Sequence, residues 1–358
     1  MDRSRLVILV TIALLGTGAF LYFSQDRTAG VNSAPPASTA RGADTLRYSV
    51  EDLPNINRLP QIVAERKGFF AREGLNVEFV EFASSFRAPA GGGDAAADQL
   101  SEREATEAGS IHMSRQQMPL LINASMSGER ERIGVGIAVS NPVYFLVVSP
   151  DITSFDDLRG KSVAVTGPHD GITLWTRELI EQHGLGINDY QTLRIASSGA
   201  RLECLTSREC AAAALAQPQV FEALDAGFHS LGITNEVEPL LYQFDAADPA
   251  WAAANRDMVV KYIRAIAAAN RFILDANNHE EVVEITMEYM REPEDRTRQM
   301  LSYIWDRNNR VLHEQPAIDI ENVRAAISLF GKYGILTESL PMPDRFVDTS
   351  YATEAAAQ

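Results

Sequence analysis

Residues 167–171, with the sequence GPHDG, lie where a strand pattern gives way to a helix pattern. The preceding SVAVT at 162–166 is typical of a strand, and Ile172, Trp175 and Leu179 follow at helical spacing. A strand, a glycine-rich turn and a helix together direct free backbone N–H groups and the positive helix end toward a ligand. We therefore expect a ligand contact here, and an ordinary strand-to-helix turn is the alternative.

His169 and Asp170 are polar side chains of this turn that can hydrogen-bond a ligand beside the backbone N–H of Gly171. In the alternative, Asp170 is the N-cap of the helix and its hydrogen bond is local. Trp175 can stack on an aromatic or pyrimidine ligand, although its spacing with apolar neighbours also favours packing in the core.

The motifs of common catalytic sites are absent from the sequence. It contains no GxSxG, no HExxH and no Cys–His pattern of known spacing, and GPHDGIT lacks the lysine of a phosphate-binding loop. The two cysteines, Cys204 and Cys210, are too few for a disulfide scaffold or a thiolate zinc site. They can form one disulfide if the chain turns between them, but not from one continuous helix. We predict a non-enzyme without a metal or a cofactor.

Further polar segments follow other predicted strands. Strands alternate with helices along the chain, which indicates an α/β fold with mostly parallel sheets and ligands at the carboxyl ends of the strands. Arginine suits bidentate recognition of a carboxylate or sulfonate, whereas a solvated surface arginine is the alternative. Asparagine is also common in plain turns. The additional ligand-binding candidates are Asn55, Asn57, Ser114, Arg115, Gln116, Asn141 and Gln217.

Composition limits the partners that the protein can have. The chain has 358 residues, of which 46% are hydrophobic, so it can bury one large or two medium cores. Its formal net charge of -16 argues against nucleic acid as a partner, because phosphate binding needs clustered cations. A small anion is not excluded, since local N–H groups and a single arginine can outweigh the global field.

Residues 6–23 form an uncharged apolar run behind Arg3 and Arg5. Such a run is just long enough to cross a bilayer, and the arginines would keep its start on the cytoplasmic side. We predict a signal anchor or signal peptide at 1–25, and the anchor is favoured because no A-x-A cleavage site directly follows. Residues 26–43 are predicted to be a disordered linker. The folded part would then lie in the periplasm, either free or anchored to the inner membrane.

Four segments together carry a resemblance to a known family. They are LPQIVA with KGFFAREGLNVEFVEF within 59–82, DITSFDDLRGKSVAVTGPHDG at 151–171, DAGF at 225–228 and NRDMVVKYIRAI at 255–266. In this order they resemble the periplasmic substrate-binding proteins of ABC importers, in the group that takes up nitrate, sulfonates, taurine and the pyrimidine precursor of thiamine. The resemblance covers about residues 46–351.

The resemblance implies a type II periplasmic binding protein fold, in which two α/β lobes close over a ligand like a hinged clamp. The implied parts are a first lobe at 44–140 and 233–351, a second lobe at 141–232, hinge crossings at 140–141 and 233–235, and a disordered tail at 352–358. The alanine- and glycine-rich segment at 88–98 is longer than the family leads us to expect, and a membrane anchor replaces the more usual secreted or lipidated start.

The function that the resemblance implies is capture of a small organic, anionic ligand, a sulfonate, a carboxylate or an aromatic or pyrimidine compound, for an ABC importer. The partners would be the permease and ATPase subunits, and the protein would be a monomer. One alternative is an enzyme on the same fold, of the thiamine-pyrimidine or menaquinone-precursor type, although the Cys-rich motif of the former is absent. Another is a periplasmic sensor domain, which would need a partner protein.

Overall fold

The computed structural model describes residues 45–51, 54–82, 104–128, 131–336 and 339–357. The predicted anchor at 6–23, the predicted linker at 26–43 and the segment at 88–98 lie outside these residues. Within the part of the chain that is described, no helix is long and apolar enough to cross a membrane.

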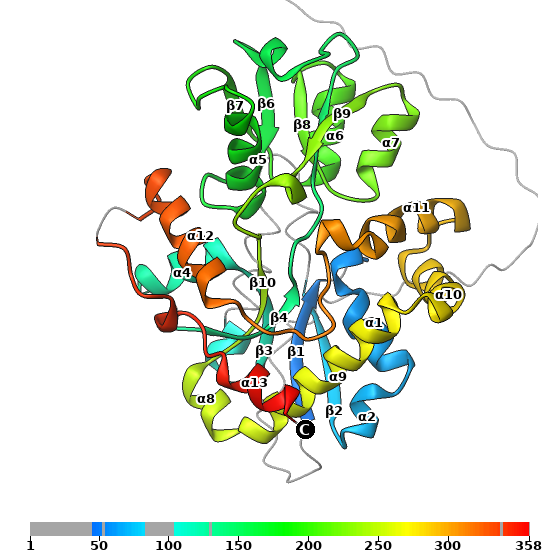
Figure 1. Cartoon of the computed structure of the whole chain (residues 1–358), viewed down its shortest axis with the longest axis vertical. Coiled ribbons are helices and arrows are strands. Elements are labelled where there is room, and N and C mark those ends of the chain that lie inside the picture. The colour runs from blue at the N-terminus through cyan, green and yellow to red at the C-terminus, as the bar shows by residue number, and fades with distance from the viewer. Residues whose placement is uncertain (1–44, 52–53, 83–103, 129–130, 337–338, 358) are drawn as a thin grey trace, which may run out of the picture. The chain divides into compact units, whose positions relative to one another are not determined.

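Two five-stranded sheets form the framework (Figure 1). The first has the order β2-β1-β3-β10-β4 and the second the order β7-β6-β8-β5-β9. The strands of the first sheet are β1 (Thr45–Glu51), β2 (Asn76–Phe82), β3 (Met113–Gln117), β4 (Ile133–Val139) and β10 (Gln243–Ala247). Those of the second are β5 (Phe145–Val148), β6 (Ser162–Val165), β7 (Gln191–Arg194), β8 (Ala212–Leu215) and β9 (His229–Ile233).

Both sheets are mixed, so the prediction of mostly parallel sheets is only partly correct. β1 pairs in parallel with β2 and β3, and β6 pairs in parallel with β7 and β8. β10 runs antiparallel to β3 and β4, and β5 runs antiparallel to β8 and β9. The antiparallel strands are those that the chain enters directly after it crosses from one sheet to the other.

The two crossing segments meet at a pair of buried asparagines. The chain leaves the first sheet after Val139, and it returns to that sheet at Gln243. Asn235 Nδ2 donates to the backbone oxygens of Asn141, at 2.8 Å, and of Asn309, at 2.9 Å. Asn141 Nδ2 also donates to the Asn309 oxygen, at 3.2 Å. These bonds tie the two crossings to one another and to the C-terminal part of the chain.

The helices cover the sheets, and several of their ends follow the signals in the sequence. The α-helices are α1 (Leu59–Arg66), α2 (Phe69–Arg72), α4 (Met118–Met126), α5 (Gly171–Gln182), α6 (Ser198–Thr206), α7 (Gln219–Asp225), α8 (Pro249–Ala254), α9 (Arg256–Leu274), α10 (His279–Met290), α11 (Glu294–Trp305), α12 (Ile320–Lys332) and α13 (Ser350–Ala356). Short 3-10 helices occur at Ile56–Arg58, Phe155–Leu158, Thr234–Glu236, Ala276–Asn278, Arg307–Asn309 and Pro343–Arg345. Asp319, a residue type that favours the start of a helix, caps α12 by accepting from Glu321 N at 2.9 Å.

The predicted disordered tail at 352–358 is wrong for most of its length, because α13 runs from Ser350 to Ala356. Tyr351, Ala352 and Ala355 are buried in the same cluster as residues of α9. Arg256 binds Glu354 at 2.7 Å and lies over the ring of Tyr351. Burial of an apolar face against α9 therefore orders a segment whose composition alone gives no such signal.

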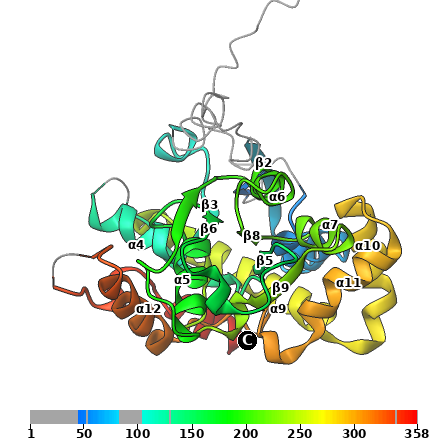
Figure 2. The same cartoon turned by 90° about the horizontal axis from the view of Figure 1, so that it is seen from above.

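Two C-terminal helices lie against opposite sides of the lobe that contains the second sheet (Figures 1 and 2). On one side, Phe330 of α12 packs edge-on against Trp175 of α5, with centroids 6.2 Å apart. On the other, Tyr303 of α11 packs edge-on against Phe145 at 5.0 Å, and Arg296 of α11 pairs with Asp225. The described lobes are thus joined by packed side chains as well as by the crossings.

Cys204 and Cys210 form a disulfide. α6 ends at Thr206, and Arg208 then adopts a positive φ of 63°, so the chain turns back. Cys210 N donates to the Cys204 oxygen at 3.1 Å, which brings the two Cα atoms within 5.5 Å. The sequence allowed a disulfide only if the chain turns between the two cysteines, and the structure shows such a turn.

Replacing both Cys204 and Cys210 by serine should lower the free energy of unfolding by about 2 kcal/mol, because the short closed loop no longer restricts the unfolded chain. Urea unfolding of the variant and of the oxidised wild-type protein measures the difference. A reductant should destabilise the wild type by a similar amount and leave the variant unchanged. An equal response of both proteins to the reductant would contradict the assignment.

Candidate functional site

A cleft between the two lobes contains three adjoining cavities, of about 670, 220 and 20 Å³. Glu51 and Asn55 line all three of them. The first lobe contributes the end of β1 and the start of α4, and the second contributes the turns after β6, β7 and β8. A concave site of this size between two lobes suits a small-molecule ligand.

Seven of the predicted residues line this cleft. Asn55, Asn57 and Gln217 line the cavity of 220 Å³. Asn55 also lines the larger cavity, where the structure places the remaining members of the set, Arg115, Gln116, His169 and Asp170. They come from four separate stretches of the chain, so the rule that ligands bind beyond the carboxyl ends of strands led to a shared location. Arg115 and Gln116, however, lie within β3 and do not follow a strand as predicted.

Four predicted residues lie elsewhere, and each has a structural role that accounts for its position. Ser114 is buried and accepts a hydrogen bond from Gln116 Nε2 at 3.0 Å. Asn141 belongs to the buried crossing. Trp175 is fully buried, and its Nε1 donates to the Pro239 oxygen at 2.7 Å, so the packing alternative is the correct one. Gly171 is buried where a Cβ atom would lie 2.6 Å from Leu241.

The N-terminus of α5 is occupied by the protein itself. Asp170 Oδ1 accepts from Ile172 N at 2.8 Å, and Gln117 Oε1, from the first lobe, accepts from Gly171 N at 3.0 Å. Burial raises the pKa of Asp170, while hydrogen bonds from Thr166 and Ile172 N oppose that rise. The N-cap alternative therefore applies, and the helix end expected to receive an anion already holds two side-chain oxygens.

Sequence analysis missed several residues of the cleft, among them Glu51, Tyr144 and Arg194. Glu51 is the last residue of β1 and Arg194 the last of β7, so the strand-end rule applied to every predicted strand would have found both. Tyr144 precedes β5, at the start of a strand, where that rule gives no signal. Arg115 and Arg194 now place one arginine from each lobe at the same cavity.

Arg115 lies among carboxylates. Its Nη2 atom is 3.6 Å from Glu51 Oε2, and Asp245 is its partner across the β3–β10 ladder. Asp245 is buried and accepts from the hydroxyls of Tyr48, at 2.6 Å, and Tyr262, at 3.0 Å. Burial raises the pKa of Asp245 to about 6, although the two hydroxyls and Arg115 act in the opposite direction.

The raised pKa of Asp245 makes stability depend on pH in a defined sense. The carboxyl of Asp245 has a pKa of about 6 in the folded protein, whereas an unfolded aspartate has a pKa of about 3.9. The stability that the bound proton contributes is therefore fully present below the unfolded pKa, and it is lost as the pH rises through the folded pKa. Relative to wild type, Asp245→Asn should become more stable by about 3 kcal/mol between pH 4 and pH 8. Urea unfolding at a series of pH values measures this, and a constant difference would contradict it.

A buried arginine supports the second-lobe side of the cleft. Arg201 is fully buried on α6 and donates to the backbone oxygens of Ala214 at 2.6 Å, Ala196 at 2.7 Å and Ile195 at 2.9 Å. Burial lowers the pKa of Arg201 to about 10, and the negative charge of Asp170 opposes this effect. At neutral pH the guanidinium is therefore charged and fixes the two segments that lead into the cleft.

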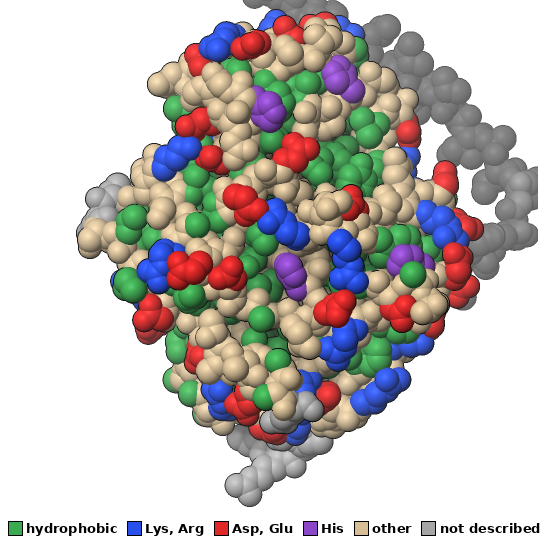
Figure 3. All heavy atoms as spheres, viewed as in Figure 1, with side chains coloured by type: hydrophobic (Ala, Val, Ile, Leu, Met, Phe, Trp, Pro, Cys, Tyr) green, Lys and Arg blue, Asp and Glu red, His purple; other side chains and the backbone are tan. Residues whose placement is uncertain are grey.

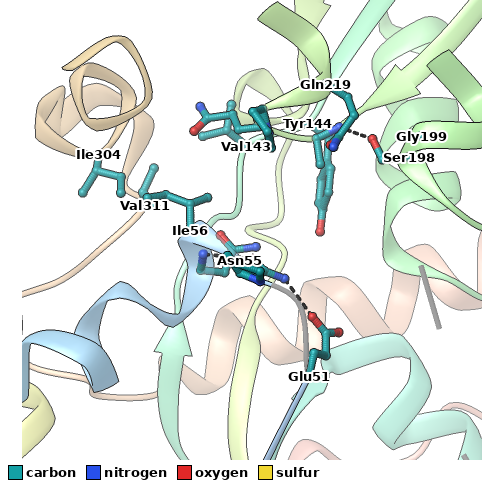
Figure 4. A pocket seen from close by; sticks show the side chains of 15 residues that line it. Glu51, Asn55, Ile56, Val143, Tyr144, Ser198, Gly199, Gln219, Ile304 and Val311 are labelled. Carbon is teal, nitrogen blue, oxygen red and sulfur yellow. Dashed lines mark hydrogen bonds between the residues drawn. The ribbon is translucent and has the colours of Figure 1, made fainter. Parts of the chain in front are cut away.

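Tyr144 points its ring from the second lobe toward Glu51 and Asn55 of the first (Figure 4). The residue is buried, with 4% of its surface exposed. Burial raises the pKa of Tyr144, so its hydroxyl stays protonated and can donate a hydrogen bond into the cleft. Apolar side chains also line the cavity of 220 Å³: Val143 lies beside Tyr144, and Ile56, Ile304 and Val311 lie farther from it (Figure 4).

Outside the cleft, a further cavity of about 340 Å³ is lined by residues that include Ser149, Lys161 and Arg208. On the face shown in Figure 3, lysine and arginine side chains are interspersed with aspartate and glutamate. Among the residues that the structure describes, no group of three or more His, Cys, Asp or Glu side chains is placed to hold a metal ion.

The two mixed sheets, their crossings and the cleft between them define a type II periplasmic binding protein fold, which confirms the predicted fold class. The model of the NMT1-like family matches residues 53–287, so the chain belongs to the NMT1-like family. No curated protein matches the chain in sequence.

Solved structures with the same fold confirm the resemblance seen in the sequence. The chain is similar to the alkanesulfonate-binding protein SsuA of Xanthomonas axonopodis pv. citri, bound to MOPS, with a TM-score of 0.65 and 17% identity over 86% of this chain and 99% of that one. It is also similar to the periplasmic nitrate-binding protein NrtA of Synechocystis PCC 6803, with a TM-score of 0.67 and 16% identity over 88% and 89%. The desulfurization enzyme DSZB shares the fold too, with a TM-score of 0.61 and 14% identity over 88% and 99%.

Proposed function

We propose that the protein is the solute-binding component of an ABC importer and captures a small organic anion between its two lobes. The observation that supports this most directly is the cavity of about 670 Å³ lined by Arg115 of the first lobe and Arg194 of the second. An anion held by both arginines interacts with both lobes, and arginine is well suited to carboxylate and sulfonate groups.

The mechanism follows from differential affinity. A ligand that contacts both lobes binds the closed arrangement more tightly than an open one, so it shifts the equilibrium toward closure. The permease and its ATPase would then recognise the closed form and receive the ligand. The protein acts in this scheme as a monomer that binds one solute without changing it.

A periplasmic location agrees with two features of the chain. Disulfides such as Cys204–Cys210 persist in oxidising compartments, including the periplasm. The apolar run at 6–23 behind Arg3 and Arg5 has the pattern of an export signal or an anchor.

An enzyme on this fold is the main rival, because DSZB shares it. His169 and Asp170, the adjacent histidine and carboxylate in the cleft, do not favour catalysis. Asp170 directs Oδ1 to the backbone N–H of Ile172, as a helix cap does, and it is adjacent to the histidine in sequence.

A thermal-shift screen of the purified protein against sulfonates, aromatic carboxylates, pyrimidines and nitrate tests the proposal. A ligand at 100 times its Kd should stabilise the folded protein by about 2.7 kcal/mol. The shift should be lost in Arg115→Ala and in Arg194→Ala, and should persist in Arg159→Ala, a control whose arginine is exposed and pairs with Asp156 and Asp189. Conversion of the bound compound over time would instead favour an enzyme.

A further inference from the structure

Glu51 occupies the point where the three cavities of the cleft meet. Its Oε2 atom accepts from Asn55 Nδ2 at 3.0 Å and is 3.6 Å from Arg115 Nη2. Both contacts are made by this one oxygen, and the side chain remains 32% exposed. A partly exposed carboxylate therefore lies beside the arginine that the proposed function uses to hold an anion.

The charge around Arg115 is already compensated. Glu51 lies on one side of it, and Asp245 is its partner across the ladder. A simple anion at Arg115 would meet the like charge of Glu51 at close range, which is unfavourable in a partly buried site. A ligand that also brings a hydrogen-bond donor to Glu51 replaces this repulsion by a charge-assisted hydrogen bond.

Tyr144 adds a polar group on the opposite wall. Its hydroxyl makes no hydrogen bond with any described residue, and Figure 4 shows the ring directed from above toward Glu51 and Asn55. A donor group such as an amine, placed between this hydroxyl and the carboxylate, can hydrogen-bond to both, because the hydroxyl also accepts.

We propose that Glu51 determines specificity, and that the ligand is a small acid with an amine or similar donor only a few bonds from its acid group. This inference rests on the proposed function. The short separation of the two ligand groups follows from the 3.6 Å between Arg115 Nη2 and Glu51 Oε2. The carbon skeleton can then extend toward Ile56, Val143 and Ile304 in the smaller cavity.

Calorimetric titration of the full chain with two matched pairs of probes tests the inference. The pairs are 3-aminopropanoate with propanoate, and 3-aminopropane-1-sulfonate with propane-1-sulfonate. In the wild type, the amino compound of each pair should bind at least about tenfold more tightly than its amino-free partner, because one charge-assisted hydrogen bond has an effect of that size. In Glu51→Gln that preference should disappear, with the amino acid losing affinity and the amino-free acid gaining it. Glu81→Gln changes an exposed carboxylate on the neighbouring strand and should behave as wild type.

In Glu51→Gln, the affinity for the amino acid should fall while the affinity for the amino-free acid rises. These opposite changes distinguish a residue that determines specificity from one that only supports the structure. If Glu51→Gln weakens both members equally, Glu51 merely positions Arg115 and Asn55, and the inference is overturned. If the wild type binds amino-free acids as tightly as amino ones, the inference fails while the proposed function stands. Binding of none of the four probes also overturns it, and the wider thermal-shift panel then judges the proposed function separately.

Discussion

Replacing Arg201 by methionine is expected to lower the free energy of unfolding by about 3–5 kcal/mol, the cost of breaking a buried charged network by removing one partner. The volume of the side chain is nearly kept, but the oxygens of Ala214, Ala196 and Ile195 lose their donors. Asp170, which is also buried, loses the nearby positive charge that lowers its pKa. The loss of hydrogen bonds and the loss of charge compensation therefore add in one direction.

Urea unfolding followed by circular dichroism measures this effect. Arg159→Met is the matched control, because Arg159 is exposed and its ion pairs with Asp156 and Asp189 lie at the surface. Pairs of that kind contribute about 0–1 kcal/mol, so the control should stay close to wild type. A loss of similar size in both variants would show that the buried hydrogen bonds of Arg201 are not what stabilises the second lobe.

Trp175→Ala should cost about 3–5 kcal/mol of stability, because it removes a large, fully buried side chain between α5 and α12. Trp175→Phe should cost less. It keeps most of the apolar contact with Phe330 but leaves the Pro239 oxygen without the donor it has at 2.7 Å.

The same variants distinguish packing from ligand binding. Because Trp175 is buried away from the cleft, Trp175→Phe should be less stable yet keep the affinity of the wild type for any solute that the thermal-shift screen finds. Unfolding in urea and calorimetric titration measure the two quantities on one protein sample. A variant with wild-type stability and strongly weakened binding would restore the stacking role that the sequence left open.

Features fixed by local signals could be predicted from the sequence. Asp319 caps α12, and Gly184 follows α5 with a φ of 91°, each a residue type typical of that end of a helix. The fold class followed from four segments in a characteristic order. β10 gave no such signal, because its central residue is the buried Asp245. The Asp245 carboxylate is stabilised by hydrogen bonds from Tyr48, 197 residues away, and from Tyr262, contacts that no local pattern shows.

In the candidate site, too, some features could be predicted from local signals in the sequence and others could not. The rule that ligands bind at strand ends led to Arg115 and Asn55, and applying it to β1 and β7 as well would have led to Glu51 and Arg194. The state of the α5 N-terminus could not be predicted. Gln117, which accepts from Gly171 N, lies 54 residues earlier in the chain and in the other lobe.

The central claim is that one acidic solute is held by an arginine from each lobe. Calorimetric titration of a solute found in the screen, into wild-type protein, Arg115→Ala, Arg194→Ala and the double variant, tests it most directly. We predict one site per chain and a loss of affinity of about tenfold or more in each single variant, since each removes a charge-assisted hydrogen bond. The solute should be recovered unchanged. Wild-type affinity in the double variant would contradict the account.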